Sequence, residues 1–143
     1  MFSANSRAAL NSYRNVGVET GVASASPQRL ILMLYEGAIA AIAAAQQHLR
    51  QNNIAAKGEA ISKAISIIDG GLKASLDVKA GGILAERLAG LYDYMLTRLL
   101  AANLRNDTKI LDEVARLLDE LRGAWAQIGQ RSGADNATEA NTK

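Results

Sequence analysis

Apolar residues recur at intervals of three and four along most of this chain, the spacing of one face of an α-helix, and no stretch shows the alternation of a half-buried strand. Four helices are predicted, over about residues 27–50, 54–76, 83–106 and 107–128. Connections of only a few residues between rods of this length force successive rods to run antiparallel. The predicted fold class is therefore all-α, an antiparallel up-down-up-down four-helix bundle.

Short polar residues mark the predicted helix ends. Ser26 is expected to cap the first helix, because a serine oxygen accepts a bond from a free backbone N–H and Pro27 fits the first helical position. The asparagines at 52 and 53 predict the first turn. Asn106 or Asp107 is expected to cap the fourth helix.

Two glycine pairs interrupt the helical pattern. Gly70-Gly71 falls inside the second helix, where each glycine costs about 1 kcal/mol relative to alanine. A bend or early fraying is expected there. Gly81-Gly82 predicts a flexible connection before the third helix.

The ends of the chain differ in composition from its centre. Residues 1–25 are polar and small with sparse apolar anchors, which predicts a mobile N-terminal arm. Residues 26–128 form the four-helix bundle domain. Residues 129–143 are polar, small and aperiodic, and a disordered tail is expected there.

The first and third helices are more apolar than one core-facing side requires. Leu32 and Ile39 widen the apolar face of the first helix, and Leu96, Leu100 and Leu104 add a second stripe to the third. Neighbouring helices, the N-terminal arm or the second copy of a homodimer could cover these residues. Alternatively, they form a surface for an amphipathic helix of a partner. The residues alone leave both interpretations open.

Composition and charge narrow the functional classes. The chain has no cysteine, which excludes disulfides, thiolate catalysis and cysteine-ligated metals. The net charge is only +2, and basic residues alternate with acidic ones. Because nucleic-acid binders gather Lys and Arg on one stripe, no nucleic-acid partner is predicted. No apolar run reaches the length of a signal peptide or the ~20 residues of a membrane span, so a cytoplasmic protein without membrane insertion is expected.

Few residues offer chemistry. His48 is the only histidine, and one histidine without cysteines does not make a zinc site. A phosphotransfer bundle would present an exposed histidine with lysine and glycine at helical spacing, which the residues after His48 do not provide. Asp93 has no second carboxylate at i+3 or i+4 for acid–base work. We therefore expect no catalytic residue, no metal and no cofactor, and histidine phosphotransfer stays only as a remote alternative.

Three blocks occur in a fixed order along the chain. They are the residues at 24–39 (SASPQRLILMLYEGAI), Leu91-Tyr92-Asp93-Tyr94-Met95 with Arg98-Leu99 and Ala102-Asn103, and Leu118-Asp119-Glu120-Leu121-Arg122 with Ala124-Trp125. Together they resemble the FliS family, the bacterial flagellar secretion chaperones for flagellin, over roughly residues 8–128. Tyr13 lies in a segment similar to that family's N-terminal arm.

The resemblance implies a cytoplasmic bundle that binds the C-terminal helical segment of unpolymerised flagellin. It implies that the chaperone prevents premature polymerisation and delivers flagellin to the export gate of the flagellar type III secretion apparatus. In the family the arm can occupy part of the same surface, and the tyrosine matched by Tyr13 is implicated in binding. The alternative is a chaperone or adaptor of the same fold for another flagellar protein, such as the anti-sigma factor.

The expected cargo contacts are the arm tyrosine and the extra apolar positions. They are Tyr13, Leu32, Ile39, Ile67, Leu96, Leu100 and Leu104. The first and third helices lie diagonally in a bundle of this topology, so one narrow groove could not use both stripes. A ligand that wraps around the bundle could.

Overall fold

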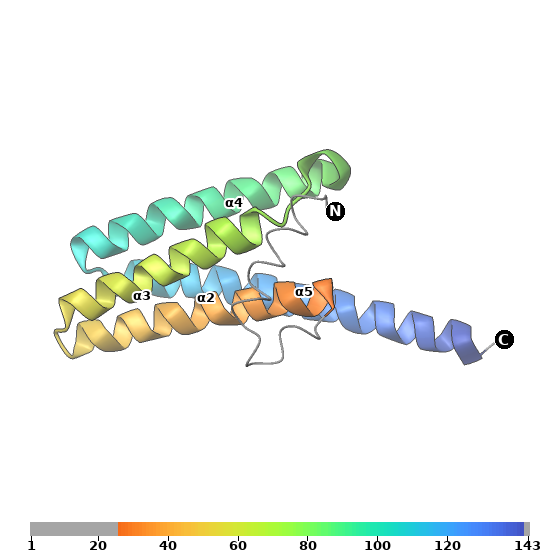
Figure 1. The fold of residues 1–143 in the computed structure, drawn as a ribbon, viewed down its shortest axis with the longest axis horizontal. Coiled ribbons are helices and arrows are strands. Elements are labelled where there is room, and N and C mark those ends of the chain that lie inside the picture. Colours follow the sequence, from red (N-terminus) through yellow and green to blue (C-terminus); the bar gives the residue numbers. More distant parts are fainter. Residues whose placement is uncertain (1–25, 142–143) are drawn as a thin grey trace.

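The computed structural model describes residues 26–141, and the side chains among them as far as Gly129. These residues form four long helices and no strand (Figure 1). The elements are α2 (Pro27–Arg50), α3 (Ile54–Ser66), the π-helical turn η3 (Ile67–Lys73), α4 (Val78–Arg105) and α5 (Thr108–Asn141). The predicted all-α four-helix bundle is confirmed. The predicted N-terminal arm lies outside the described residues.

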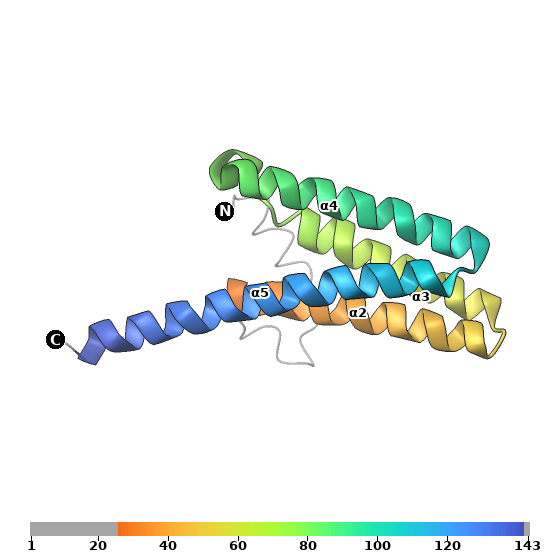
Figure 2. The ribbon, with the colours of Figure 1, turned by 180° about the vertical axis from the view of Figure 1, so that it is seen from behind.

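The helices pack as a ring in which each contacts two neighbours. Helix α2 packs against α3 and η3 on one side and against α5 on the other. Helix α4 likewise packs against α3 and η3 on one side and against α5 on the other. Figures 1 and 2 show successive helices running in opposite directions, with α5 extending beyond the bundle. Helices α2 and α4 therefore lie diagonally, and the bundle has four lateral faces.

The helix ends follow the expected local chemistry. The Ser26 side chain accepts a hydrogen bond of 3.1 Å from the backbone N–H of Arg29. Asn52 turns the chain with a φ of 56°, a conformation that asparagine tolerates. Asn53 then caps α3 by accepting from the backbone N–H of Ala56 at 3.2 Å. The first helix and the first turn therefore lie where the sequence predicts them.

The start of α5 is capped in the same way. The Asp107 carboxylate accepts from the backbone N–H of Lys109 at 2.9 Å, and Asn106 ends α4 in the left-handed conformation. Helix α5 then continues to Asn141, whereas the sequence pattern places its end near Ile128. Once a helix is nucleated, each further residue adds one backbone bond at little cost. No proline follows to stop it.

Both glycine pairs distort the backbone as expected. Around Gly70-Gly71 the second helix widens into η3, where the N–H of Ala74 donates to the carbonyl of Asp69, five residues back. Gly82 has a φ of 58°, which favours glycine, and it separates a first turn from the regular part of α4. Regular helix thus resumes at residue 83, where the third helix is predicted to begin.

One apolar core runs through the centre of the ring. Its largest fully buried side chains come from every helix: Ile42, Ile61, Ile68, Leu72, Met95, Leu99, Leu111, Val114 and Leu118. Helix α2 contributes the most residues to this core. By length and composition α2 could also cross a membrane, which corrects the expectation that no segment could. Eight of its residues are instead buried in the core of the bundle.

Two polar contacts join the helices at the end of the bundle where α2 begins. The hydroxyls of Tyr35 on α2 and Tyr92 on α4 share a buried hydrogen bond across the core. Trp125 on α5 donates from its indole Nε1 to the backbone carbonyl of Gln28, 3.0 Å away, in the first turn of α2. The sequence blocks around Ser26, Tyr92 and Trp125 therefore meet at one end of the fold.

Removing one hydroxyl of the tyrosine pair should destabilise the bundle. We expect Tyr92→Phe to lower the free energy of unfolding by about 1–3 kcal/mol, because the Tyr35 hydroxyl would stay buried without this partner. The double variant with Tyr35→Phe should cost less than the sum of the two single variants. Urea denaturation of all four proteins gives this comparison, and strictly additive costs would argue against the bond.

The same pair predicts a loss of stability in alkali. Burial raises the pKa of both hydroxyls, and the neighbouring Tyr35 raises the pKa of Tyr92 further. The folded state therefore favours the neutral tyrosines, a contribution that is complete below the unfolded pKa of about 10 and is lost as the pH rises above it. Between pH 10 and pH 12, wild-type protein should lose stability more steeply than the double phenylalanine variant.

Candidate functional site

Polar contacts identify the edge of α4 that faces α3. Lys73 Nζ on η3 lies 2.6 Å from Asp93 Oδ1. About three turns further along α4, Lys57 Nζ on α3 donates to Asn103. Positions 93, 96, 100 and 103 follow helical spacing, so Leu96 and Leu100 lie along this edge.

The opposite edge of α4 faces α5 and is polar. Tyr94 donates from its hydroxyl to Glu113 Oε2 at 2.8 Å, and Arg98 Nε donates to Glu113 Oε1 at 2.7 Å. The hydrogen bond from Arg98, then that from Tyr94, holds the pKa of the Glu113 carboxyl below its usual value. A shallow groove also runs along this edge, and its lining residues are Leu91, Tyr94, Glu113, Arg116, Leu117 and Glu120.

The side chains of the predicted stripe on α4 become more exposed along the helix. Leu96 is half-buried, Leu100 is 61% exposed and Leu104 is 85% exposed. Ile54, one turn before Lys57 on α3, is also exposed. We call this surface the α3/α4 face; its residues are Ile54, Gly58, Leu96, Leu100, Asn103 and Leu104, with Lys57 buried beneath them. No described helix covers its two exposed leucines.

The predicted stripe on α2 lies on another face of the ring. Gln46 donates to Asp112 of α5, and Leu32 and Ile39 precede Gln46 at intervals of seven on the same edge of α2. Both apolar side chains are half-buried. Ile39 lines a shallow groove with four residues of α5: Asp112, Ala115, Arg116 and Asp119. This α2/α5 face lies opposite the α3/α4 face, because α2 and α4 are diagonal.

The structure does not bring the remaining predicted residues to either face. Ile67 is 8% exposed, and its Cδ1 would lie 3.5 Å from a Cβ added at Gly37. Ile67 thus packs against α2 and fills the core between α2 and η3. Tyr13 lies outside the described residues.

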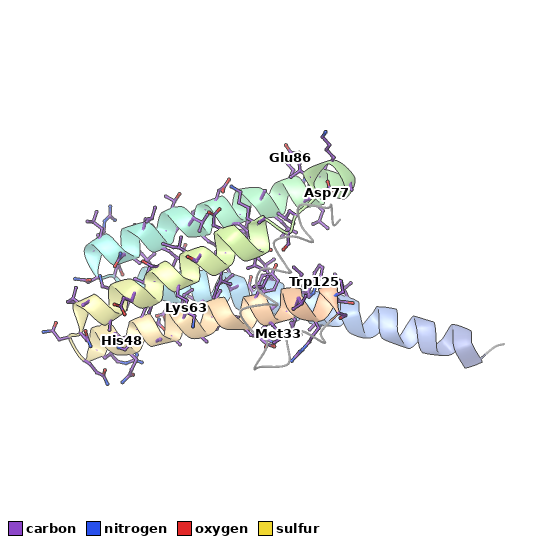
Figure 3. The ribbon with its side chains drawn as sticks, in the orientation of Figure 1. Met33, His48, Lys63, Asp77, Glu86 and Trp125 are labelled. Atoms are coloured by element: carbon purple, nitrogen blue, oxygen red, sulfur yellow. The ribbon has the colours of Figure 1, made fainter. Side chains whose placement is uncertain are left out.

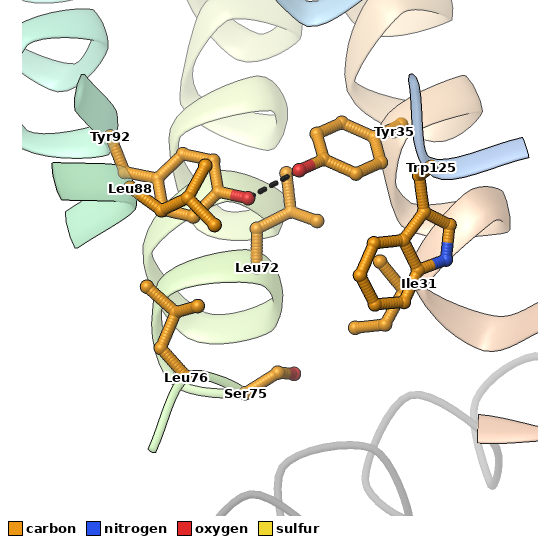
Figure 4. A pocket seen from close by; sticks show the side chains of 8 residues that line it. All are labelled: Ile31, Tyr35, Leu72, Ser75, Leu76, Leu88, Tyr92 and Trp125. Carbon is orange, nitrogen blue, oxygen red and sulfur yellow. Dashed lines mark hydrogen bonds between the residues drawn. The ribbon is translucent and has the colours of Figure 1, made fainter. Parts of the chain in front are cut away.

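The end of the bundle near η3 contains a small cavity (Figure 4). Its volume is about 30 Å³, the share of one water in the liquid. The lining residues are Ile31, Tyr35, Leu72, Ser75, Leu76, Leu88, Tyr92 and Trp125. The two tyrosine hydroxyls bind each other there, so the cavity presents no free reactive group.

Sequence reasoning missed the exposed apolar residues around the kink in α4. Val78, Ile83 and Leu84 lie on either side of the kink at Gly82, and each exposes half or more of its surface. The Gly81-Gly82 pair was the available signal, since the kink at Gly82 changes which side of the helix faces the core.

The only histidine offers no activated group. Figure 3 shows His48 near the end of α2, beside the α2–α3 turn. Its Nδ1 atom is buried without a hydrogen-bond partner. Within the described part of the chain no three His, Asp or Glu side chains gather as metal ligands.

Known proteins with similar sequences share one description. Residues 9–132 match the family described as Flagellar protein FliS. The chain is 51% identical over 123 residues to the Flagellar secretion chaperone FliS of Salmonella typhimurium, covering 86% of this chain and 91% of that protein. It is 44% identical over 115 residues to the protein of the same name from Escherichia coli, covering 80% and 85%. The Bacillus subtilis protein of that name is 33% identical over 117 residues, covering 82% and 86%.

Proposed function

The chain belongs to the FliS family of flagellar secretion chaperones, and from this we propose that it is a cytoplasmic export chaperone of flagellin. It binds the C-terminal helical segment of unpolymerised flagellin and prevents premature polymerisation. It then delivers flagellin to the export gate of the flagellar type III apparatus. The observation that supports this most directly is the exposure of Leu100 and Leu104 on a helix whose core face is already complete.

An amphipathic helix of the cargo suits this surface. Such a helix binds through apolar side chains spaced one turn apart, and Leu100 and Leu104 offer apolar contacts at the same spacing. Burying them removes apolar area from water, at roughly 25 cal/mol per Å². A cargo helix seated on the α3/α4 face therefore covers surface that folding of the chaperone leaves open.

The second stripe favours a cargo that wraps around the bundle. Leu32 and Ile39 lie on the opposite face, so a single straight helix cannot contact both stripes. A segment that is disordered when free and folds on the chaperone can. Its ordering entropy lowers the affinity, which suits a cargo that has to leave at the export gate.

Titration with a synthetic C-terminal flagellin peptide tests the proposal. We expect the peptide to gain helicity on binding and full-length flagellin to co-purify with the chaperone. Flagellin without its C-terminal segment should not bind, and equal binding would overturn the proposed mode. Competition with the flagellar anti-sigma factor separates the two cargo assignments, because the tighter ligand displaces the other. Sedimentation of the free chaperone shows whether a homodimer covers the same leucines.

A further inference from the structure

A buried lysine lies beneath the α3/α4 face. Lys57 is 3% exposed, and its Nζ donates to the backbone carbonyl of Asn103 at 2.8 Å and to the side-chain Oδ1 of Asn103 at 2.7 Å. An ammonium has donors only, so the amide oxygen of Asn103 must face it. The amide NH₂ of Asn103 is therefore directed away from Lys57, with both of its donors free of that contact.

The charge of Lys57 has no counter-charge close by. Both of its acceptors are neutral, and among the described side chains the ion pairs are Lys73–Asp93, Arg98–Glu113 and Arg122–Asp119. A buried ammonium without a carboxylate is costly, and the carbonyls at the C-terminus of α4 offset only part of that cost. This point of the face therefore favours a negative group.

Gly58 lies beside the oxygen end of the Asn103 amide. A Cβ added at Gly58 would meet only Asn103 Oδ1, at 3.7 Å, which is an ordinary contact. Alanine would therefore fit and would favour the helix more than glycine does. No neighbour within the described chain requires a glycine here. Asn103 stays half-buried, beside the exposed Leu100 and Leu104.

We propose that the Asn103 amide, polarised and oriented by Lys57, binds one carboxylate of the cargo helix. The chaperone then recognises the cargo helix by two kinds of contact. Apolar side chains of the cargo pack against Leu100 and Leu104, and one Asp or Glu that lies between those cargo side chains binds Asn103. A charge-assisted bond of this kind is stronger than a neutral one and fixes the register of the helix. This inference rests on the proposed function, since it assigns chemistry to that same surface.

Asn103→Asp is the decisive variant. It keeps the size of the side chain and replaces the two donors by a carboxylate oxygen. The new carboxylate pairs with Lys57, so the melting temperature should be unchanged or higher. The affinity for the flagellin peptide should fall about 10- to 100-fold, because a charged hydrogen bond is lost and two carboxylates then face each other. Asn52→Asp, in the exposed α2–α3 turn, is the matched control for net charge and should bind as wild type does.

The peptide supplies the reciprocal half of the experiment. Each Asp or Glu of the peptide is replaced in turn by its amide. One replacement should weaken binding to wild type by the same 10- to 100-fold and should have little effect on Asn103→Asp. If no replacement weakens peptide binding, the chaperone does not bind a carboxylate of the peptide and the inference is overturned.

The outcomes separate this inference from the proposed function. If Leu100→Asp abolishes peptide binding and Asn103→Asp binds as wild type does, the carboxylate contact is overturned and the proposed function stands. If both variants bind as wild type does, the α3/α4 face is not the cargo site: the carboxylate contact is overturned and the proposed function stands. If wild type itself does not bind the peptide, the proposed function is overturned, and this inference with it.

Discussion

Leu100→Asp should abolish binding of the flagellin C-terminal segment and leave the melting temperature of the chaperone almost unchanged. Leu100 is 61% exposed, so its carboxylate variant stays in water when the chaperone is free. In the complex the same carboxylate would be buried against an apolar cargo side chain. Burying an unpaired charge costs several kcal/mol, which corresponds to at least a hundredfold loss of affinity.

Isothermal titration with the flagellin peptide and a thermal melt of the free protein measure the two halves of this expectation. Leu104→Asp, at the most exposed position of the stripe, should behave in the same way. Asn52→Asp again controls for the added charge. A collapse of the melting temperature would place Leu100 in the core, and an unchanged affinity would place the cargo elsewhere.

Leu99→Ala, in contrast, should lower the stability of the chaperone. Leu99 is fully buried and adjacent in sequence to Leu100. Truncating a buried leucine costs about 2–5 kcal/mol, because apolar contacts are lost and a cavity is left. Leu100→Ala should change the free energy of unfolding by less than about 0.5 kcal/mol, as is usual for surface positions.

Urea denaturation and thermal melts of these two alanine variants compare side chains of equal size on the same turn of α4. The melting temperature of Leu99→Ala should fall by roughly 10 °C, and that of Leu100→Ala should hardly move. Comparable losses in both variants would mean that the stripe contributes to folding. The division of α4 into a core side and a cargo side would then fail.

Local chemistry explains why the helix ends could be predicted from the sequence. Ser26, Asn53 and Asp107 each accept a bond from a backbone N–H within three residues, so their role depends on no distant part of the chain. The period of the apolar residues likewise required only the sequence. Short loops then left one sensible arrangement of the rods.

Neighbours in space could not be read from the same pattern. Ile67 and Leu100 both lie beside a core stripe on a helical wheel, yet one packs against α2 and the other is exposed. The π-helical turn that begins at Ile67 shifts the side-chain directions after Ser66, which a wheel of a regular helix does not represent. A wheel gives an angle about the helix axis and not the identity of the neighbour at that angle.

The indole of Trp125 gives the chain an optical reporter of its own. It is the only tryptophan, and its N–H is bound to the first turn of α2, where residues 1–25 join the bundle. Any ligand that displaces this contact exchanges a carbonyl partner for water and shifts the fluorescence emission. Events at that junction can therefore be followed in unlabelled protein, in real time, and apart from those at the leucines of α4.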